Sequence, residues 1–400
     1  MRIKPDRTNY KWYILALTML TYGVIAGLER MCMPVLFKEI SDDLGLSVAQ
    51  IGIIWGLDPL AGVFIGLPGG LLADRFGVKR MLAIVCLLSG IFGALRGLSI
   101  DFLTMSVSMF LFGLMAATTP SIAPKVTAQW FSRNQLGLTN ALLAISWSVG
   151  SMIATMTSAT VLSPLLGGWR NVIFAMGIPA IVAGLLWFTT GKEPHDEMKS
   201  SRLASVSFRE TLLKVIRLKE VWVIGFLQFT QWGANMGLSG YLSYYLKNTG
   251  WTAAGADSAV TLISAASLAG VIPMVILADR IGSRKKMLFF SVVVMSLSLL
   301  LLPFTRGVMV YIVLVISCFL RAGLPALFNT LVIEIKGIGS QYGGSAIGLA
   351  STIGMIGAFI GPPLGNSFAS STHPELPFFF WAAFSSIGLP LFIFLRKSSG

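Results

Sequence analysis

The sequence predicts an all-α membrane protein with twelve transmembrane helices in two pseudo-symmetric bundles of six. Two observations support this fold class. Hydrophobic residues make up 55% of the 400 residues and charged residues only 12%, about half of the charged share of a soluble protein. The hydrophobic residues also gather in long runs, and a helix needs about 20 apolar residues to cross a bilayer. A soluble globular protein is therefore excluded.

Twelve apolar runs of sufficient length follow one another along the chain. We predict helices at residues 12–36, 49–72, 81–100, 102–124, 137–163, 171–190, 221–246, 257–277, 287–305, 308–332, 343–368 and 376–395. With a cytoplasmic N-terminus, most of the 30 Lys and Arg residues fall in cytoplasmic segments, as the positive-inside rule requires. Both termini are then cytoplasmic. The exceptions are Lys38, Arg96, Arg170, Lys247 and Arg306, expected in the opposite loops, and Arg30 and Arg321, expected within helices.

A polar stretch at residues 191–220 divides the chain into an N-terminal six-helix bundle, 1–190, and a C-terminal six-helix bundle, 221–400. Apolar and basic residues alternate from Phe208 to Val221, a pattern that predicts an amphipathic helix along the inner membrane surface. We expect this linker to tether the bundles. A regulatory or lipid-sensing role is the alternative.

One short sequence motif occurs in both predicted bundles. The order Leu-Ala-Asp-Arg at residues 72–75 returns at residues 277–280, and each copy is followed by a Gly and by basic residues. Since each copy ends one apolar run and begins the next, the pattern indicates that one membrane unit has been repeated. Such repeats are typical of secondary transporters, in which one half moves against the other around a central site.

The first copy, from Gly70 to Arg80, resembles the signature loop between helices two and three of the major facilitator superfamily. The resemblance covers the whole chain and implies a gate. In that gate Asp74 accepts hydrogen bonds from a neighbouring helix N-terminus, and the basic residues pair with carboxylates across the interface between the bundles. Simple positive-inside anchoring is the alternative. The expected gating residues are Gly70, Asp74, Arg75, Lys79, Arg80, Asp279 and Arg280.

The two copies of the loop differ at one position that matters for packing. Val275 stands in the second copy where Gly70 allows close helix approach in the first. We therefore expect the N-terminal copy to carry the gating lock and the C-terminal copy to be mainly an anchor.

Four ionisable residues lie within the predicted helices, namely Glu29, Arg30, Asp58 and Arg321. Each costs roughly 2.5–3.5 kcal/mol at a helix centre, so these side chains should face the bundle interior or a water-filled cavity. Adjacent residues on a helix do not face each other, so Glu29 and Arg30 are each expected to have another partner. An Arg30–Asp58 ion pair is one interpretation, and titration of Glu29 or Asp58 during transport is the other. Tyr22 is expected to join the polar group around Arg30.

Arg321 lies near the middle of its predicted helix, with Asn329 on its face and no carboxylate in helical register. A guanidinium at this depth suits an anionic substrate, because its planar fork matches a carboxylate. A structural partner on another helix is the alternative.

A polar stripe marks the seventh predicted helix. Gln228, Gln231, Asn235 and Ser239 recur at a spacing that places them on one face. The stripe is expected either to line a cavity or to bridge helices through hydrogen bonds. Trp147, in similar register on the fifth helix, is a weaker indication of the same cavity.

The pair Glu29-Arg30 refines the resemblance. Aligned on residues 44–47, it takes the place of an Asp-Arg pair in the anion:cation symporter branch of the superfamily. The resemblance implies that Arg30 anchors a substrate carboxylate and that Glu29 carries a proton. Two departures count against drug/proton antiport: Met109 stands where a basic residue is expected on helix four, and helix five lacks a Gly-Pro motif.

These observations predict a multi-pass transporter of the inner (plasma) membrane that moves a small organic anion, such as a carboxylate, by alternating access together with protons. Efflux of amphipathic compounds is one alternative, and a ligand sensor that transports nothing is another. The expected substrate-binding residues are Arg30, Arg321, Tyr22, Gln228, Gln231, Asn235, Trp147 and Asn329, and the expected proton-coupling residues are Glu29 and Asp58.

Other classes of protein and partner fit the sequence poorly. No constellation of His, Cys or Ser predicts an enzyme, and no motif predicts a metal site or a cofactor. The net charge of +13 comes from residues between apolar runs, so nucleic acid is not an expected partner. The expected partners are a small anionic substrate, protons and the lipid bilayer, and the expected assembly is a monomer.

Overall fold

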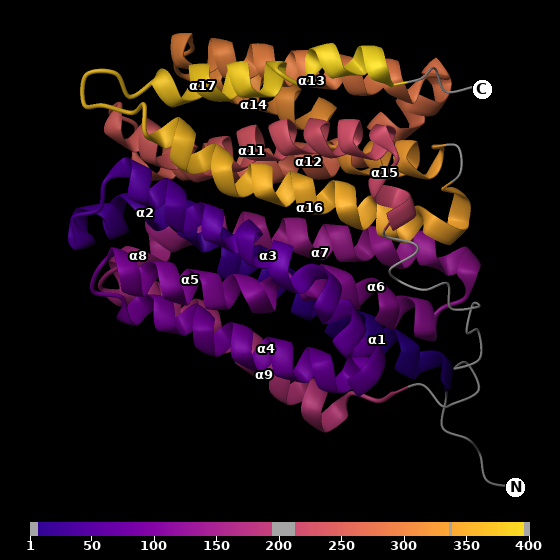
Figure 1. The fold of residues 1–400 in the computed structure, drawn as a ribbon. Helices are drawn as coiled ribbons and strands as arrows, with labels where there is room; N and C mark the ends of the chain where they lie inside the picture. The colour runs from indigo at the N-terminus through magenta and orange to yellow at the C-terminus, as the bar shows by residue number, and fades with distance from the viewer. Residues whose placement is uncertain (1–6, 194–212, 336–337, 396–400) are drawn as a thin grey trace, which may run out of the picture. The chain divides into compact units, whose positions relative to one another are not determined.

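The computed structural model describes residues 7–193, 213–335 and 338–395. This part of the chain folds into helices joined by short turns (Figure 1). Eleven of its helical segments are long and apolar enough to cross a membrane. The prediction of an all-helical membrane protein is therefore confirmed.

The eleven segments do not include α11 (Lys219–Asn248), although α11 has 30 residues. Its middle contains no charged residue, but Gln228, Gln231 and Asn235 lower its hydropathy. The polar stripe that marks this helix in the sequence therefore also makes it the least obvious membrane span.

The chain divides into two compact units. Unit 1 comprises Met1–Ile40 and Phe64–Arg202, and unit 2 comprises Ser41–Val63 and Leu203–Gly400. The long helix α3 (Val48–Phe76) contributes its first part to unit 2 and its last part to unit 1. The predicted division into bundles at residues 190 and 221 stays a prediction.

Unit 1 is held together by close helix approaches at small residues. A methyl group on Gly90 of α4 would lie 2.7 Å from the carbonyl oxygen of Gly177 on α9, so only glycine permits this contact. Besides part of α3, the helices of unit 1 are α1 (Arg7–Tyr22), η1 (Gly23–Glu29), most of α2 (Arg30–Leu44), α4 (Val78–Leu95), η2 (Arg96–Leu98), α5 (Phe102–Ala116), α6 (Thr119–Trp130), η3 (Arg133–Gln135), α7 (Leu136–Thr157), η4 (Ser158–Leu162), α8 (Ser163–Leu166) and α9 (Trp169–Thr190).

Unit 2 has α11 and α16 as its most closely packed pair. A methyl group on Gly361 of α16 would lie 2.5 Å from the carbonyl oxygen of Gly233 on α11. Trp55, on the first part of α3, is buried and donates a 3.0 Å hydrogen bond to the carbonyl oxygen of Met236. Besides α11, the helices are α12 (Ala253–Ile281), α13 (Arg284–Leu301), η6 (Leu302–Phe304), α14 (Val308–Arg321), α15 (Leu324–Ile333), α16 (Gly339–Asn366), α17 (Leu376–Ser386) and η7 (Leu389–Phe394).

The two Leu-Ala-Asp-Arg motifs are a fixed number of residues apart, and helix boundaries recur along the chain at the same separation. Both ends of α3 recur at this interval as the ends of α12. The same is true of the break between α5 and α6, which recurs as the break between α14 and α15. Each break precedes a proline, Pro120 or Pro325, in the first turn of the following helix. Two predicted helices, 102–124 and 308–332, are therefore interrupted, because proline cannot donate the backbone hydrogen bond that would continue the helix.

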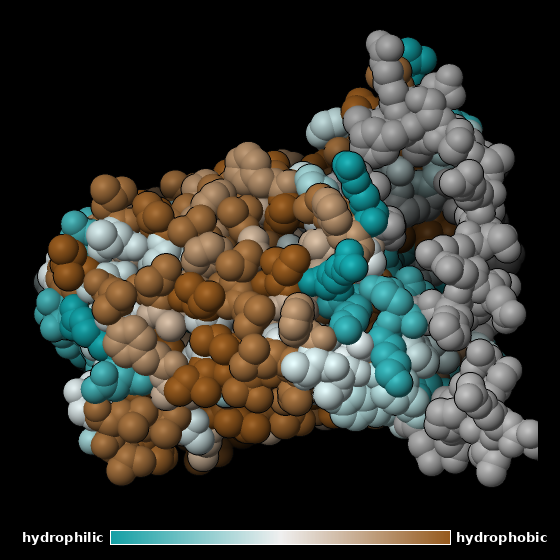
Figure 2. Space-filling view, turned by 90° about the horizontal axis from the view of Figure 1, so that it is seen from below, coloured by the Kyte–Doolittle hydropathy of each residue, from teal (hydrophilic) through white to brown (hydrophobic). Residues whose placement is uncertain are grey.

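Apolar side chains cover the face of the molecule drawn in Figure 2, with hydrophilic residues gathered toward its ends. On the outer helices of unit 1, exposed apolar residues include Ile84 and Ile91 on α4 and Ile178, Val182 and Phe188 on α9. Such a surface suits contact with lipid chains rather than with water.

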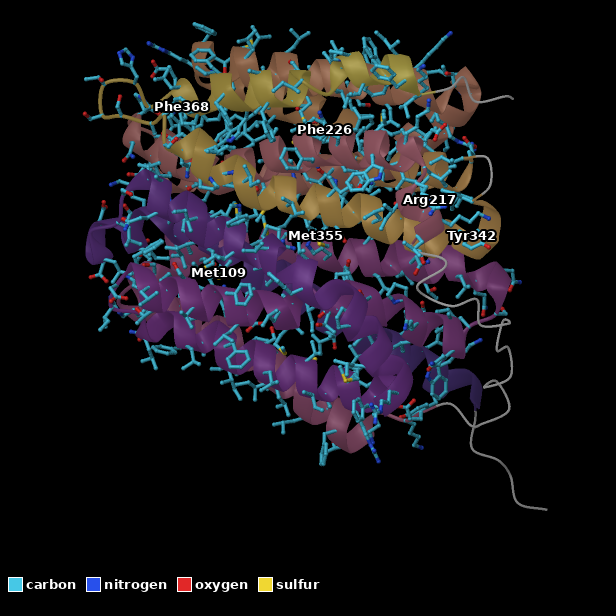
Figure 3. All side chains as sticks on the ribbon, viewed as in Figure 1. Met109, Arg217, Phe226, Tyr342, Met355 and Phe368 are labelled. Atoms are coloured by element: carbon cyan, nitrogen blue, oxygen red, sulfur yellow. The ribbon has the colours of Figure 1, made fainter. Side chains whose placement is uncertain are left out.

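The linker ends on unit 2. Residues 194–212, with much of the predicted amphipathic segment, lie outside the described residues. In the described remainder, Val215 is fully buried in the core formed with Val221, Ile224 and Leu288. The ammonium of Lys214 also lies 4.0 Å from the ring centre of Tyr342, which Figure 3 labels.

Candidate functional site

Glu29 ends the π-helical segment η1 and is completely buried. Its Oε2 accepts a 2.8 Å hydrogen bond from the hydroxyl of Ser89 on α4. Its Oε1 accepts none from the part of the chain that the structure describes. The expectation that Glu29 has a partner other than Arg30 is thus confirmed, and that partner is a neutral hydroxyl.

The π-helical segment is shaped by small residues and by α7. A methyl group on Gly27 would lie 2.7 Å from the carbonyl oxygen of Trp147, so α7 can approach η1 closely. The indole of Trp147 in turn donates a 3.0 Å hydrogen bond to the carbonyl oxygen of Ala26. Trp147 is therefore placed beside the segment that carries Glu29. Widened turns of this kind are frequent at functional sites.

Arg96 completes this buried group, and sequence reasoning missed it. The charge pattern of the sequence predicts an outer loop at this position, but the side chain of Arg96 is completely buried. Its Nη2 donates a 3.0 Å hydrogen bond to the main-chain carbonyl of Glu29, and its Nε donates one of 2.9 Å to that of Gly93. The signal that identifies it is its place inside the predicted helix 81–100 rather than beyond its end.

Arg30 and Tyr22 are both half-buried, and they lie close enough to interact electrostatically. Asp58 is 2% exposed on α3. The predicted Arg30–Asp58 pair would join the two units and stays a prediction, as do the substrate and proton roles of these residues.

Arg321 is the last residue of α14 and is half-buried. Its Nη2 donates a 3.2 Å hydrogen bond to the hydroxyl of Ser267 on α12, and it also contacts the thiol of Cys318. Among the described residues, no carboxylate lies within ion-pair distance of its guanidinium. The C-terminal end of a helix favours a cation. Asn329 is exposed on α15, so the helix break separates it from the face that carries Arg321.

The polar stripe of α11 does not act as one surface. Gln231 is buried and donates hydrogen bonds of 3.2 Å and 3.0 Å to the carbonyl oxygen and hydroxyl of Ser385 on α17. The side-chain oxygens of Gln228 and Asn235 accept no hydrogen bond from the described residues. Gln231 thus bridges two helices, whereas Gln228 and Asn235 retain acceptors that a ligand or water can use.

The two signature loops are described only in part. Gly70 and the side chains of Asp74 and Asp279 lie outside the described set, and Arg75, Arg80 and Arg280 are exposed. At the start of α4 the amide nitrogen of Lys79 donates a 2.8 Å hydrogen bond to Glu193 Oε1. The gating role of these loops stays a prediction.

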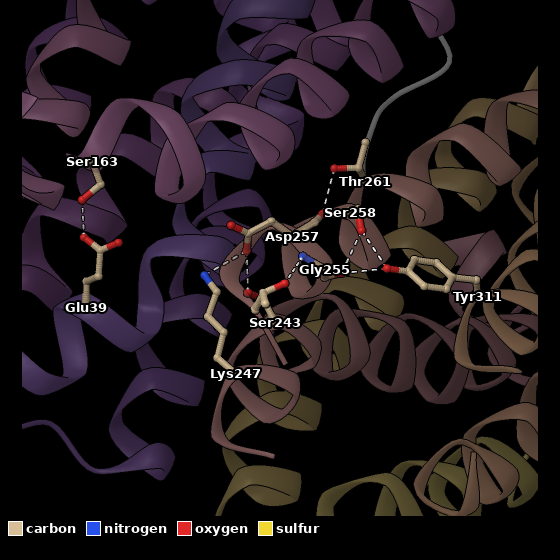
Figure 4. A network of polar contacts seen from close by, with 10 residues as sticks. Glu39, Ser163, Ser243, Lys247, Gly255, Asp257, Ser258, Thr261 and Tyr311 are labelled. Carbon is tan, nitrogen blue, oxygen red and sulfur yellow. Dashed lines mark hydrogen bonds and ion pairs between the residues drawn. The ribbon is translucent and has the colours of Figure 1, made fainter. Parts of the chain in front are cut away.

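A second buried group of charges lies in unit 2, and sequence reasoning missed it (Figure 4). Lys247 Nζ lies 2.9 Å from Asp257 Oδ1, and their side chains are 11% and 1% exposed. The hydroxyl of Ser243 donates a 2.8 Å hydrogen bond to the same oxygen. Lys247 was expected in an outer loop, and Asp257 was the first residue of a predicted helix. A charge at the edge of an apolar run thus reads as a loop residue in the sequence even where it folds inward.

Comparisons with known proteins agree with this architecture. A family model described as Major Facilitator Superfamily matches residues 18–256 and 221–400. The cis,cis-muconate transport protein of Acinetobacter baylyi is 26% identical over 386 residues, covering 92% of this chain and 91% of that protein. The probable sulfoacetate transporter SauU of Cupriavidus necator is 23% identical, covering 98% of this chain and 95% of that protein.

A shorter match is found to the probable galactarate/D-glucarate transporter GudP of Bacillus subtilis. It is 27% identical over 214 residues, which cover 50% of this chain and 45% of that protein. This chain therefore matches about half of the length of that relative.

Solved structures share the fold at low sequence identity. A bacterial homolog of the human lysosomal transporter Spinster, in an inward-facing and unoccupied conformation, matches with a TM-score of 0.80 at 16% identity over 100% of both chains. The nucleoside transporter NupG matches with a TM-score of 0.75 at 15% identity, over 97% of this chain and 99% of that chain. By its family match, its transporter relatives and its fold, this chain belongs to the major facilitator superfamily of multi-pass membrane transporters.

Proposed function

We propose that this protein moves a small organic anion, a carboxylate, across the inner (plasma) membrane by alternating access, coupled to protons. The observation that carries the proposal is the half-buried guanidinium of Arg321, which has a hydroxyl and a thiol as partners but no described carboxylate within ion-pair distance. A cation placed in this way, within an apolar span, suits an anionic ligand.

The relatives support an anionic substrate. Their names give cis,cis-muconate, sulfoacetate and galactarate or D-glucarate as what they transport. Each of these compounds carries at least one carboxylate or sulfonate. Arg30 and Arg321 are the cations we propose for binding such a group.

The coupling to protons is proposed at Glu29. An ionised carboxylate that is completely buried with a single hydroxyl donor is costly, so we infer that Glu29 holds a proton in this conformation. Together with Asp58, Glu29 balances the two intramembrane arginines Arg30 and Arg321. A proton on one acid gives the site a net positive charge, which favours a monoanion. Release of the anion then favours release of the proton.

We further propose twelve membrane spans, with α11 as the twelfth and both termini in the cytoplasm. A helix of 30 residues is long enough to cross a bilayer at about 1.5 Å per residue. Its polar side chains are acceptable inside a membrane when other helices surround them, and Gln228 and Gln231 are each 1% exposed. The transporter is proposed to work as a monomer.

The anion site is tested by uptake into proteoliposomes of radiolabelled cis,cis-muconate, D-glucarate and sulfoacetate. Arg321→Ala should reduce uptake of the transported compound at least tenfold, because it removes the proposed ligand. Arg217→Ala is the matched control, since Arg217 is an exposed arginine of unit 2. Uptake by Arg321→Ala with unchanged affinity and rate would show that Arg321 does not bind the anion.

Proton coupling is tested in the same vesicles. An inside-alkaline pH gradient should accelerate uptake by the wild-type protein, and Glu29→Gln should abolish this acceleration while exchange of internal for external anion continues. Uptake that ignores the gradient in the wild type would remove the proton from the mechanism.

A further inference from the structure

The guanidinium of Arg96 is a completely buried positive charge. The described part of the chain offers it no carboxylate within ion-pair distance. Its guanidinium instead donates to the main-chain carbonyls of Gly93 and Glu29. It also lies 4.1 Å from the ring centre of Phe112. Burial of a guanidinium is costly, and two carbonyls and one aromatic face offset only part of that cost.

The carboxyl of Glu29 lies next to this cation without pairing with it. A methyl group on Gly93 would lie 2.6 Å from Glu29 Oε1 and 3.4 Å from Arg96 Nη2. Both atoms therefore border the same gap, which exists because Gly93 has no side chain. The oxygen that faces this gap is the one without a hydrogen bond in the described structure.

Arg96 has N–H groups that are not used in its main-chain hydrogen bonds and can donate to Glu29 Oε1. A guanidinium carries five N–H groups, and its main-chain bonds use only Nε and Nη2. Nη1 rests 3.9 Å from the sulfur of Met109, a weak acceptor (Met109 is labelled in Figure 3). A small turn of the guanidinium can therefore reach the carboxylate while Nε keeps its bond to Gly93.

We propose that Arg96 is a positioning residue for Glu29 and serves as the counter-ion that replaces its proton. When Glu29 releases the proton to water, the O–H bond of its carboxyl breaks and a carboxylate remains. The guanidinium, which stays protonated, then turns into the gap over Gly93 and pairs with that carboxylate. This inference rests on the proposed proton-coupling role of Glu29. It adds the cation that stabilises the carboxylate of Glu29 after deprotonation inside the membrane.

The surroundings of Glu29 leave Arg96 as the cation best placed for this task. Among the described residues, the titratable groups that interact with Glu29 are Arg96 from η2, Cys32 from α2 and Cys86 from α4. The two thiols carry no positive charge in any state. Met109 occupies the position on α5 where the family resemblance implies a basic residue, and the guanidinium of Arg96 rests against its sulfur. The charge at this place in unit 1 thus comes from η2, which directly follows α4.

The test titrates Glu29 directly and needs no substrate. Infrared difference spectroscopy of the full-length protein in lipid vesicles follows the carboxyl C=O stretch against pH, and the band that disappears in Glu29→Gln belongs to Glu29. Arg96→Met should shift the midpoint of this band upward by about one pH unit or more, because the nearby cation that favours the carboxylate is lost. Arg96→Lys keeps the charge and should stay close to the wild type.

A purely structural role for Arg96 predicts a different result. It would leave the midpoint of the Glu29 band unchanged in Arg96→Met, and that outcome overturns the inference. If the wild-type protein shows no titrating band that Glu29→Gln removes, the proton-coupling role of Glu29 fails first, and the inference fails with it. If Arg96→Met does not fold, Arg96→Lys provides the test. A midpoint of the Glu29 band that lies about one pH unit or more above the wild type in Arg96→Lys, although the charge is kept, also overturns the inference.

Discussion

The amide nitrogen of Lys79 donates a 2.8 Å hydrogen bond to the side chain of Glu193, which follows the last helix of unit 1. Lys79 lies in the first turn of α4, directly after Gly77, whose φ of 88° closes the turn. An anion at a helix N-terminus satisfies free N–H groups and interacts favourably with the helix dipole. The start of the linker thereby holds the loop that resembles the family signature.

Replacement of Glu193 should loosen this loop. Glu193→Ala is expected to lower the free energy of unfolding by about 1 kcal/mol, as loss of a helix cap does. Trypsin should also cut faster near Lys79 and Arg80. Lys192→Ala is the matched control, because Lys192 is an exposed neighbour that makes no bond to the amides of α4. Equal cleavage rates in both variants would contradict a capping role for Glu193.

Gly93 keeps open the gap between Glu29 and Arg96. Gly93→Ala places a methyl group 2.6 Å from Glu29 Oε1 and should reduce proton-driven uptake at least tenfold, because the carboxyl must move away. Gly137→Ala is the control, since nothing lies within 4 Å of its added methyl group. Similar losses of uptake in the two variants would show that the space at Gly93 is not what matters.

The buried pair of Lys247 and Asp257 should stabilise unit 2 mainly by keeping both charges compensated. Lys247→Met leaves the carboxylate of Asp257 buried without its lysine and should cost about 3 kcal/mol. In the double variant Lys247→Met/Asp257→Asn no net charge is buried, and part of the loss should return. Thermal unfolding in detergent measures both. Additive losses in the double variant would contradict compensation between the two charges.

Asp101 should give α5 a stability that depends on pH. Hydrogen bonds from the amide and hydroxyl of Thr104 lower the pKa of Asp101, which caps the helix. A carboxyl whose pKa is lower in the folded state stabilises fully above its unfolded pKa, and this contribution is lost as pH falls through the folded pKa. The unfolding temperature of the wild type should therefore drop more than that of Asp101→Asn below about pH 4. Parallel curves would exclude this contribution.

The sequence identified charges that stand alone in apolar runs. Glu29 and Arg321 were found because a charge is conspicuous among apolar neighbours, and both are buried or half-buried in the structure. Arg96, Lys247 and Asp257 were missed because they lie near the ends of runs. There the positive-inside pattern counts a basic residue as a loop residue whether or not it folds inward.

The sequence was least informative about where helices break and which side chains meet. Pro120 and Pro325 lie inside apolar runs, and prolines are tolerated within membrane helices, so neither predicted an end. The polar stripe of α11 has the right period, but period alone does not say which neighbour a side chain meets. Gln231 meets Ser385 on α17, a contact that depends on the packing of helices far apart in the chain.

The repeated break before Pro120 and Pro325 carries a consequence for how the two halves diverged. At the equivalent point before each break, one half has Ala116 and the other has Arg321. The break is thus present in both halves, whereas the charge is present in only one. The proposed anion ligand is therefore a separate feature from the proline that begins the helix after each break. Replacing the side chain at position 116 or 321 leaves both prolines, and with them the two breaks, in place.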